Sequence, residues 1–251
     1  MISLMLQCCP LDCDAAMELT ELICALESER REETEFFLVY RKDCPPNLPK
    51  LFNNEVPKKF GRAQARMARN HAEGHPEGAN MLAGSAFIEL SILRREGLCQ
   101  NEAALIFEPD CLPMCSDWLD QLSAEWELTK GLGKEAFGHW HQQGGPETLH
   151  MNGNAVFRTD FWDLHPTWII GPGLLGWDYW FKDNFIPISR DSDLIFQLYN
   201  TYGMRYETFT ALTKNGRRPA LLHGIKTPDG RQNAWKMLVS PPIRNVAHAQ
   251  S

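Results

Sequence analysis

The opening segment of the chain constrains the fold more than any other part of the sequence. Residues 2–9 form a short apolar run that Pro10 interrupts, and residues 14–30 place their large aliphatic side chains on one helical stripe. Residues 35–40 (EFFLVY) then form a second run of strand-forming side chains. A strand, a helix and a strand in this order favour two parallel strands joined by a right-handed crossover. The sequence therefore predicts an α/β fold.

The pattern that follows extends this sheet and covers it with helices. Residues 44–57 contain four prolines and predict a loop. In residues 58–70, apolar side chains and basic side chains each recur at three- and four-residue steps, which predicts a helix. Residues 80–95 and 116–130 also predict helices, and the apolar run at 103–107 between them is typical of a buried strand. We expect a Rossmann-like sheet, mixed but mostly parallel, with flanking helices.

Size and charge limit the classes of function. With 251 residues, 43% of them hydrophobic, the chain predicts one domain in two halves, residues 1–115 and 116–240, and a loosely attached tail at 241–251. The net charge of −7 gives no overall attraction for nucleic acid or anionic membrane. No apolar run approaches the roughly 20 residues that cross a bilayer, and the amino terminus is unlike a signal peptide. We therefore predict a cytoplasmic protein with no membrane span.

Two carboxylates occur where the predicted strand 103–107 ends. Glu108 and Asp110 are separated only by Pro109. In open α/β sheets, ligands bind beyond the carboxyl ends of parallel strands. Two carboxylates at this spacing suit a hard divalent cation that takes its other ligands from water and a diphosphate. The alternative is that Asp110 only stabilises a turn and Glu108 is solvated.

Five segments resemble, in their order along the chain, the nucleotide-sugar glycosyltransferases of the GT-A fold. The acidic pair (EPD, 108–110) is similar to the D-x-D-type motif that follows a central strand in that family. HPEGANMLAGSAFIEL (75–90) resembles the segment before that strand, and HMNGNAVFR (150–158) resembles the acceptor-side strand after it. GWDYWF (176–181) is similar to the motif with a catalytic or acceptor-contacting acid, and LLHGIK (221–226) to the segment with a late histidine.

The resemblance implies a metal-dependent transferase that moves a hexosyl or pentosyl group from a nucleoside-diphosphate sugar to a hydroxyl acceptor. Residues 1–115 would bind the nucleotide sugar and residues 116–240 the acceptor. The resemblance also implies Mn²⁺ or Mg²⁺ held by Glu108, Asp110 and His223. We expect the residues that contact the donor to be Pro10, Arg62, Asn80 and Lys226.

Other functions stay compatible with these residues. The same acids would serve a nucleotidyltransferase or a nucleotide hydrolase, and a sugar- or nucleotide-binding module without turnover would need the same pocket. The stereochemical outcome of transfer also stays open, because Glu108 stands where the family motif begins with aspartate. The spacing of His223, Gly224 and Lys226 is likewise shorter than the H-x-x-G-x-x-K spacing of glycogenin-type members.

Asp178 is the predicted catalytic base. It lies between Trp177 and Tyr179, and partial removal from water raises the pKa of a carboxylate. A carboxylate of raised pKa suits proton abstraction from an acceptor hydroxyl. The alternative is an aspartate at the edge of the core that accepts hydrogen bonds from the backbone. For His223, the alternative to metal binding is an interior histidine with satisfied hydrogen bonds.

A basic stripe accompanies the predicted helix 58–70. Lys59, Arg62, Arg66 and Arg69 recur at three- and four-residue steps and would form one ridge on an acidic protein. Such a ridge is either a solvated helix face or an anion-binding surface. It would hold the donor diphosphate or the phosphates of hydroxymethylated DNA, the acceptor of some phage enzymes of related type. DNA is therefore an alternative to a saccharide acceptor.

The eight cysteines do not indicate a disulfide framework, because the chain is much longer than the small secreted domains that depend on one. Cys111 and Cys115 follow the acidic pair, and Cys8 and Cys9 end the first predicted strand. If these strands are neighbours, the thiols would meet and could bind zinc. The alternative is that they are small buried hydrophobic residues.

Overall fold

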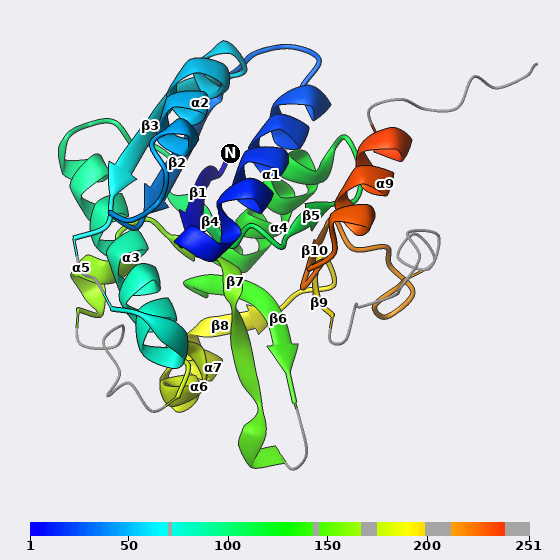
Figure 1. The fold of residues 1–251 in the computed structure, drawn as a ribbon. Helices are drawn as coiled ribbons and strands as arrows, with labels where there is room; N and C mark the ends of the chain where they lie inside the picture. Colours follow the sequence, from blue (N-terminus) through cyan, green and yellow to red (C-terminus); the bar gives the residue numbers. More distant parts are fainter. Residues whose placement is uncertain (70–71, 143–145, 167–174, 199–211, 239–251) are drawn as a thin grey trace, which may run out of the picture.

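A computed structural model of the chain describes residues 1–69, 72–142, 146–166, 175–198 and 212–238 (Figure 1). Within these residues, seven strands form a larger sheet in the order β3-β2-β1-β4-β7-β6-β8, and three form a smaller sheet in the order β5-β10-β9. The larger sheet contains β1 (Ser3–Cys8), β2 (Arg31–Tyr40), β3 (Phe60–Met67), β4 (Ala103–Phe107), β6 (Ala136–His141), β7 (His150–Arg158) and β8 (Ser189–Asp191). The smaller sheet contains β5 (Leu112–Pro113), β9 (Ile195–Gln197) and β10 (Leu221–His223).

The larger sheet is mixed but mostly parallel, which confirms the predicted fold class. β1, β2, β3 and β4 run parallel to one another, whereas β7 is antiparallel to both β4 and β6, and β8 is parallel to β6. The predicted opening of strand, helix and parallel strand is also confirmed. Because β1, β2 and β4 are parallel, their carboxyl ends lie at the same edge of the sheet.

Helices cover both faces of the larger sheet (Figure 1). Leu4 and Leu6 of β1 pack with α1, α2 and α4, whereas Met5 packs with α3, α5, α6 and α7 on the other face. This alternation explains why β1 is buried along its whole length. The helices are α1 (Cys13–Leu26), α2 (Asn47–Glu55), α3 (Ala79–Arg95), α4 (Trp118–Gly131), α5 (Phe161–Leu164), α6 (Trp177–Trp180), α7 (Lys182–Ile188) and α9 (Pro228–Leu238). Short helical turns are η1 (Pro10–Asp12), η2 (Val56–Lys58), η3 (Gly74–Gly78) and η4 (Pro146–Thr148).

Two predicted elements are wrong. The predicted helix at 58–70 is the edge strand β3, which pairs in parallel with β2 through partners such as Leu38 and Ala65. The predicted loop at 44–57 contains α2, which buries Leu48 and Phe52 one helical turn apart. The proline content misled here, because Pro49 lies in the first turn of the helix, where its missing N–H is not needed.

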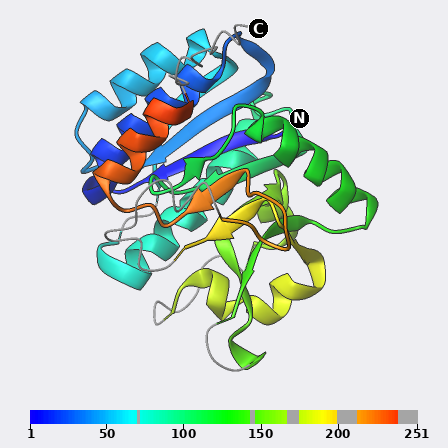
Figure 2. The ribbon, with the colours of Figure 1, turned by 90° about the vertical axis from the view of Figure 1, so that its right-hand side faces the viewer.

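The last described helix returns to the beginning of the chain. α9 lies beside α1 (Figure 2), and Arg231 Nε donates to Glu18 Oε2 at 2.5 Å. The predicted tail at 241–251 lies outside the described residues. No helix among the described residues is both long and apolar enough to cross a membrane.

Candidate functional site

The structure brings Glu108, Asp110 and His223 together at the carboxyl end of β4. The potential ligand atoms of these three residues all lie within 4.8 Å of one another. His223 Nε2 lies 3.1 Å from Glu108 Oε2 and 3.0 Å from Asp110 Oδ1. The two acids follow β4 directly, whereas His223 is the last residue of β10 in the smaller sheet. The site is therefore built where the two sheets meet.

The backbone around Asp110 connects the two sheets. Its carbonyl oxygen accepts the N–H groups of Gly224 at 3.2 Å and Ile225 at 2.8 Å, directly after His223. Gly224 has a φ of +96°, and a Cβ at this position would lie 2.4 Å from the carbonyl oxygen of Leu198. Only glycine fits this turn, which places the His223 ring against the two carboxylates.

Asn154 of β7 contacts both Glu108 and His223, and sequence reasoning missed it. Its Oδ1 accepts the backbone N–H of Glu108 at 2.7 Å, and its Nδ2 lies 3.4 Å from Glu108 Oε2 and 3.1 Å from each ring nitrogen of His223. Gln197 Oε1 contacts His223 Nδ1 from the other side. The signal available in the sequence was a pair of asparagines, Asn152 and Asn154, that alternate with small or apolar residues in β7.

Opposite charges control the protonation of the group. Burial would lower the pKa of His223, but Asp110 and Glu108 outweigh it and raise this pKa to about 9. Burial would raise the pKa of Asp110, but His223 and then Lys226 outweigh it and hold this pKa below its usual value. Without a metal ion, the group therefore contains an imidazolium between carboxylates at neutral pH.

The residues present fit a divalent cation. Asp110 Oδ1 is buried and has no well-directed hydrogen-bond donor among the described residues, although it lies close to His223 Nε2. Two carboxylates and an imidazole suit Mn²⁺ or Mg²⁺ once the histidine has lost its proton. The side chain of His223 is only 9% exposed, whereas that of Glu108 is 41% exposed, so the group opens to solvent on the Glu108 side.

Asp178 lies in α6, near the three residues Glu108, Asp110 and His223, which we call the acidic group. Its Oδ2 accepts the N–H of Gly153 in β7 at 3.1 Å, and its Oδ1 accepts the N–H of Tyr179 at 2.9 Å. Trp177 packs closely on Gly153, where a Cβ would lie 3.0 Å from the indole ring. Burial raises the pKa of Asp178, and the negative charge of Glu108 acts in the same direction. The hydrogen bonds of Asp178 are those expected of a structural aspartate that accepts backbone N–H groups. Its raised pKa is the property expected of a catalytic base.

Asn80, a predicted donor contact, holds the segment that leads to Asp178. It is buried in α3, and its Nδ2 donates to the carbonyl oxygen of Leu175 at 2.9 Å. Its Oδ1 accepts the N–H of Trp177 at 2.8 Å. Both ends of the amide are thus engaged with backbone groups, and Asn80 positions α6.

The other predicted donor contacts divide between the two edges of the sheet. Pro10 begins η1, directly beyond the carboxyl end of β1. Lys226 is exposed three residues after His223, and its charge reaches Asp110. Arg62 lies elsewhere: its Nη1 is 3.5 Å from Glu35 Oε1, a carboxylate that also accepts the backbone N–H of Gln100 before β4 begins. The structure therefore does not bring Arg62 to the acidic group.

The predicted basic ridge does not exist as a helix face. Arg62 and Arg66 lie in β3, and Lys59 and Arg69 lie outside it. Each of the four side chains contacts an acceptor of the protein: Lys59 the carbonyl oxygen of Glu27, Arg62 Glu35, Arg66 Glu96 and Arg69 Glu89. The predicted helix is wrong, so its single ridge does not form. The three arginines are paired with carboxylates, and anion binding by these residues stays a prediction.

All eight cysteines are free, but the predicted grouping differs from the observed one. Cys111 Sγ lies 3.3 Å from Asn154 Oδ1, and Cys115 Sγ lies 3.4 Å from the Gln121 amide. Among the described residues, neither joins Cys8 in a potential metal-binding group.

The fold of the chain resembles that of several solved structures. The galactosyltransferase LgtC, in complex with donor and acceptor sugar analogs, superposes with a TM-score of 0.58 over 96% of this chain and 98% of its own, at 10% identity. Mouse xyloside xylosyltransferase 1 superposes with a TM-score of 0.52 over 89% of this chain and 97% of its own, at 9% identity. The chain has the GT-A fold.

A third structure shows the GT-A fold within a longer protein. The mannosyltransferase PcManGT from Pyrobaculum calidifontis, in complex with GDP-Man and Mn²⁺, has a TM-score of 0.51 and 12% identity. The alignment covers 76% of this chain and 53% of that protein. No family model and no curated protein sequence matches the chain, so its likeness to GT-A proteins rests on three-dimensional structure.

Proposed function

We propose that the protein is a metal-dependent glycosyltransferase that moves a sugar from a nucleoside-diphosphate donor to a hydroxyl acceptor. The observation that carries this proposal is the group of Glu108, Asp110 and His223 at the carboxyl end of β4 in a GT-A fold. Ligands of open α/β sheets bind at this edge. The mannosyltransferase solved with GDP-Man and Mn²⁺ supports the expectation of a nucleotide sugar and a metal ion.

Glu108, Asp110 and His223 would hold Mn²⁺ or Mg²⁺ in this proposal. When bound, the ion would offset the negative charge that grows on the departing diphosphate. Lys226 adds a positive charge that, after that of His223, helps to lower the pKa of Asp110. Asn154 and Gln197 orient the histidine through its ring nitrogens, which is the usual role of residues behind a metal ligand.

Asp178 would act as the base in a direct displacement. The acceptor oxygen forms a bond to the anomeric carbon of the donor sugar, and the bond between that carbon and the diphosphate oxygen breaks. The electron pair of that bond leaves with the diphosphate, and the acceptor proton moves to an oxygen of Asp178. The raised pKa of Asp178 increases its affinity for this proton.

The surface beside Asp178 supports a saccharide acceptor. Trp180 is two residues further along α6 and is 46% exposed, so the same short helix offers an apolar ring face to solvent. The alternative acceptor, modified DNA, depended on a basic ridge. Because the arginines of that stripe are paired with carboxylates, no observation now favours a polyanionic acceptor.

Two measurements, made one after the other, test this function. A thermal-shift screen of nucleotide sugars with and without Mn²⁺ identifies the donor, because a ligand of the native state raises the midpoint of unfolding. Release of nucleoside diphosphate is then measured with and without candidate saccharides. We expect release that depends on the acceptor. Release that is independent of any acceptor would indicate a hydrolase, and binding without release under any condition would indicate a binding module.

A further inference from the structure

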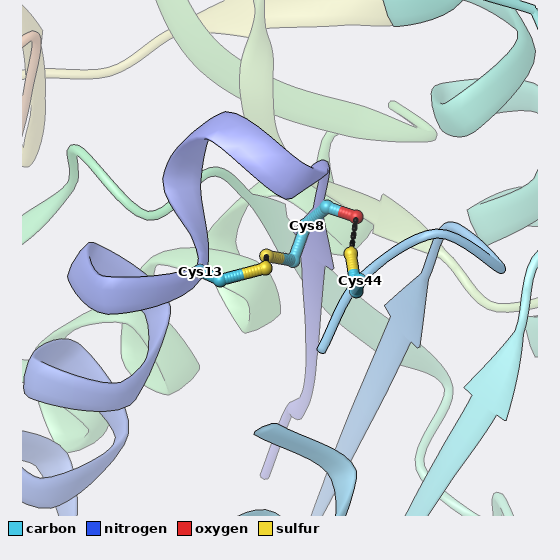
Figure 3. A group of neighbouring side chains, drawn as sticks. All are labelled: Cys8, Cys13 and Cys44. Carbon is cyan, nitrogen blue, oxygen red and sulfur yellow. Dashed lines mark hydrogen bonds between the residues drawn. The ribbon is translucent and has the colours of Figure 1, made fainter. Parts of the chain in front are cut away.

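A second group of potential metal ligands lies at the same edge of the sheet. Cys8 ends β1, Cys13 begins α1, and Cys44 follows β2. Figure 3 shows the sulfur atoms of Cys8 and Cys13 side by side, and the thiol of Cys44 directed at the carbonyl oxygen of Cys8. The three sulfur atoms all lie within 4.8 Å of one another, and each residue is at most 8% exposed. Three segments of the chain thus converge on one small, buried cluster of thiols.

One of the sulfur–sulfur distances matches the requirement of a thiolate-bound metal. Cys8 Sγ and Cys13 Sγ are 3.8 Å apart. Tetrahedral zinc, with Zn–S bonds of about 2.3 Å, separates its sulfur ligands by about 3.8 Å. A disulfide would need these atoms at about 2.05 Å, so the present geometry is that of separate thiols. Cys44 Sγ lies 3.7 Å from the carbonyl oxygen of Cys8, which places the third thiol beside the pair.

We propose that Cys8, Cys13 and Cys44 form a zinc-binding site, with three thiolate ligands and a fourth position taken by solvent. Thiolates select soft or borderline cations such as Zn²⁺ over Mg²⁺ and Mn²⁺. The adjacent Cys9 is not one of the ligands, because its thiol donates to Asp12 Oδ2 at 2.9 Å.

Only one short turn of the chain separates the three thiols from solvent at this point. The chain between Cys8 and Cys13 forms an exposed turn that includes Leu11 and Asp12, and the carbonyl oxygen of Cys9 in this turn contacts both thiols, at 3.3 Å and 3.4 Å. A small movement of this turn would admit an ion. Each thiol that binds would release its proton to solvent, as thiolate coordination requires.

The site would fix the edge of the sheet that carries the acidic group. Leu6, two residues before Cys8, pairs with Phe107, the residue before Glu108. A zinc ion on the three thiolates would join the end of β1, the first turn of α1 and the segment after β2. This role differs from that of the acidic group and does not depend on the proposed transfer reaction.

Zinc binding by the full-length chain tests the proposal directly. The reduced protein is freed of metal by chelation and titrated with Co²⁺ and Zn²⁺ in excess Mg²⁺. Co²⁺ on thiolates gives a charge-transfer absorption that carboxylate and imidazole ligands do not give, so the two groups are distinguished. We expect one Co²⁺ per chain with this absorption, and its loss when Zn²⁺ is added.

Variants assign the ligands. Cys13→Ser and Cys44→Ser should each lose the thiolate absorption, and Cys24→Ser, a buried cysteine of α1 outside the group, should keep it. Circular dichroism of the metal-free variants shows whether each one folds. The proposal is overturned if the wild type gives no thiolate absorption, if both ligand variants bind as the wild type does, or if mass spectrometry of protein purified without reductant finds the group closed as a disulfide. Binding of Cu⁺ without binding of Zn²⁺ would likewise exclude zinc as the occupant.

Discussion

The two groups at the carboxyl edge of the larger sheet differ in both ligand chemistry and access. The acidic group offers oxygen and imidazole ligands and opens to solvent through Glu108, whereas the cysteine group offers only sulfur and is almost closed. Hard cations prefer the first set of ligands and soft cations the second. A site that must admit a diphosphate needs an open side, and a site that only joins segments does not. The two groups therefore favour different metal ions at one edge of the sheet.

Replacement of Asp110 should separate the two groups most clearly. Asp110→Asn removes a charge from the acidic group, so we expect Mn²⁺-dependent donor binding to be lost while zinc uptake by the cysteines is unchanged. Calorimetry of donor binding with and without Mn²⁺ measures the first effect. Asp120→Asn, on the surface of α4, is the control. Wild-type donor affinity and metal dependence in Asp110→Asn would show that Asp110 is not a ligand.

The second prediction concerns the chemistry beside the acidic group. Asp178→Asn should lower turnover by roughly 10²- to 10⁴-fold, the usual loss for a general base, with little change in donor binding. Initial rates and donor affinity are compared with those of Asp183→Asn, an exposed acid of α7. Near-normal turnover in Asp178→Asn would mean that the residue is structural, or that transfer retains configuration and needs no such base.

Asn154 tests how far the acidic group depends on its supporting residues. Asn154→Ala removes the contacts to Glu108 and His223, and we expect Mn²⁺ affinity to fall by about 10- to 100-fold, as for other residues that orient metal ligands. Asn53→Ala is the matched control, because Asn53 of α2 also accepts a backbone N–H, that of Ala65 in the edge strand β3. Equal Mn²⁺ affinity in the two variants would remove Asn154 from the site.

The smallest expected effect is a gradual pH dependence of the metal-free protein. The pKa of His223 is raised from 6.5 to about 9 in the folded state, so its protonation stabilises the fold below pH 6.5, and this contribution is lost as the pH rises through about 9. Unfolding by denaturant with a chelator present should show stability declining across this range. His223→Gln should lack this part of the decline, and a parallel decline in the two proteins would contradict the assignment. Saturating Mn²⁺ should oppose the decline, because it binds the unprotonated histidine.

The sequence correctly predicted those elements whose residue pattern is compatible with only one type of secondary structure. The buried runs of β1, β2 and β4 are unambiguous, and Glu108 and Asp110 follow from the end of β4. The spacing of Arg62 and Arg66 is ambiguous, because a step of four residues fits both a helix turn and two alternations of a strand. Pairing with β2 decided between them.

Other parts of the site could not follow from local sequence. Asn154 belongs to the site only because β7 inserts beside β4, which no spacing within residues 150–158 specifies. The grouping of His223 with the acids was expected only from a family resemblance. The grouping of Cys13 and Cys44 with Cys8 was not expected, because it depends on where α1 begins and where the chain turns after β2.

The hydrogen bonds from Gly224 and Ile225 to the Asp110 carbonyl join segments that are far apart in the sequence, so the acidic group can form only late in the assembly of the molecule. His223 reaches Glu108 across 115 residues, whereas Cys44 reaches Cys8 across 36. During synthesis from the amino terminus, the ribosome has released all three cysteines long before it makes β10. The cysteine group can therefore close on a partial chain, but the acidic group forms only after the chain beyond His223 has left the exit tunnel and β10 has paired with β5.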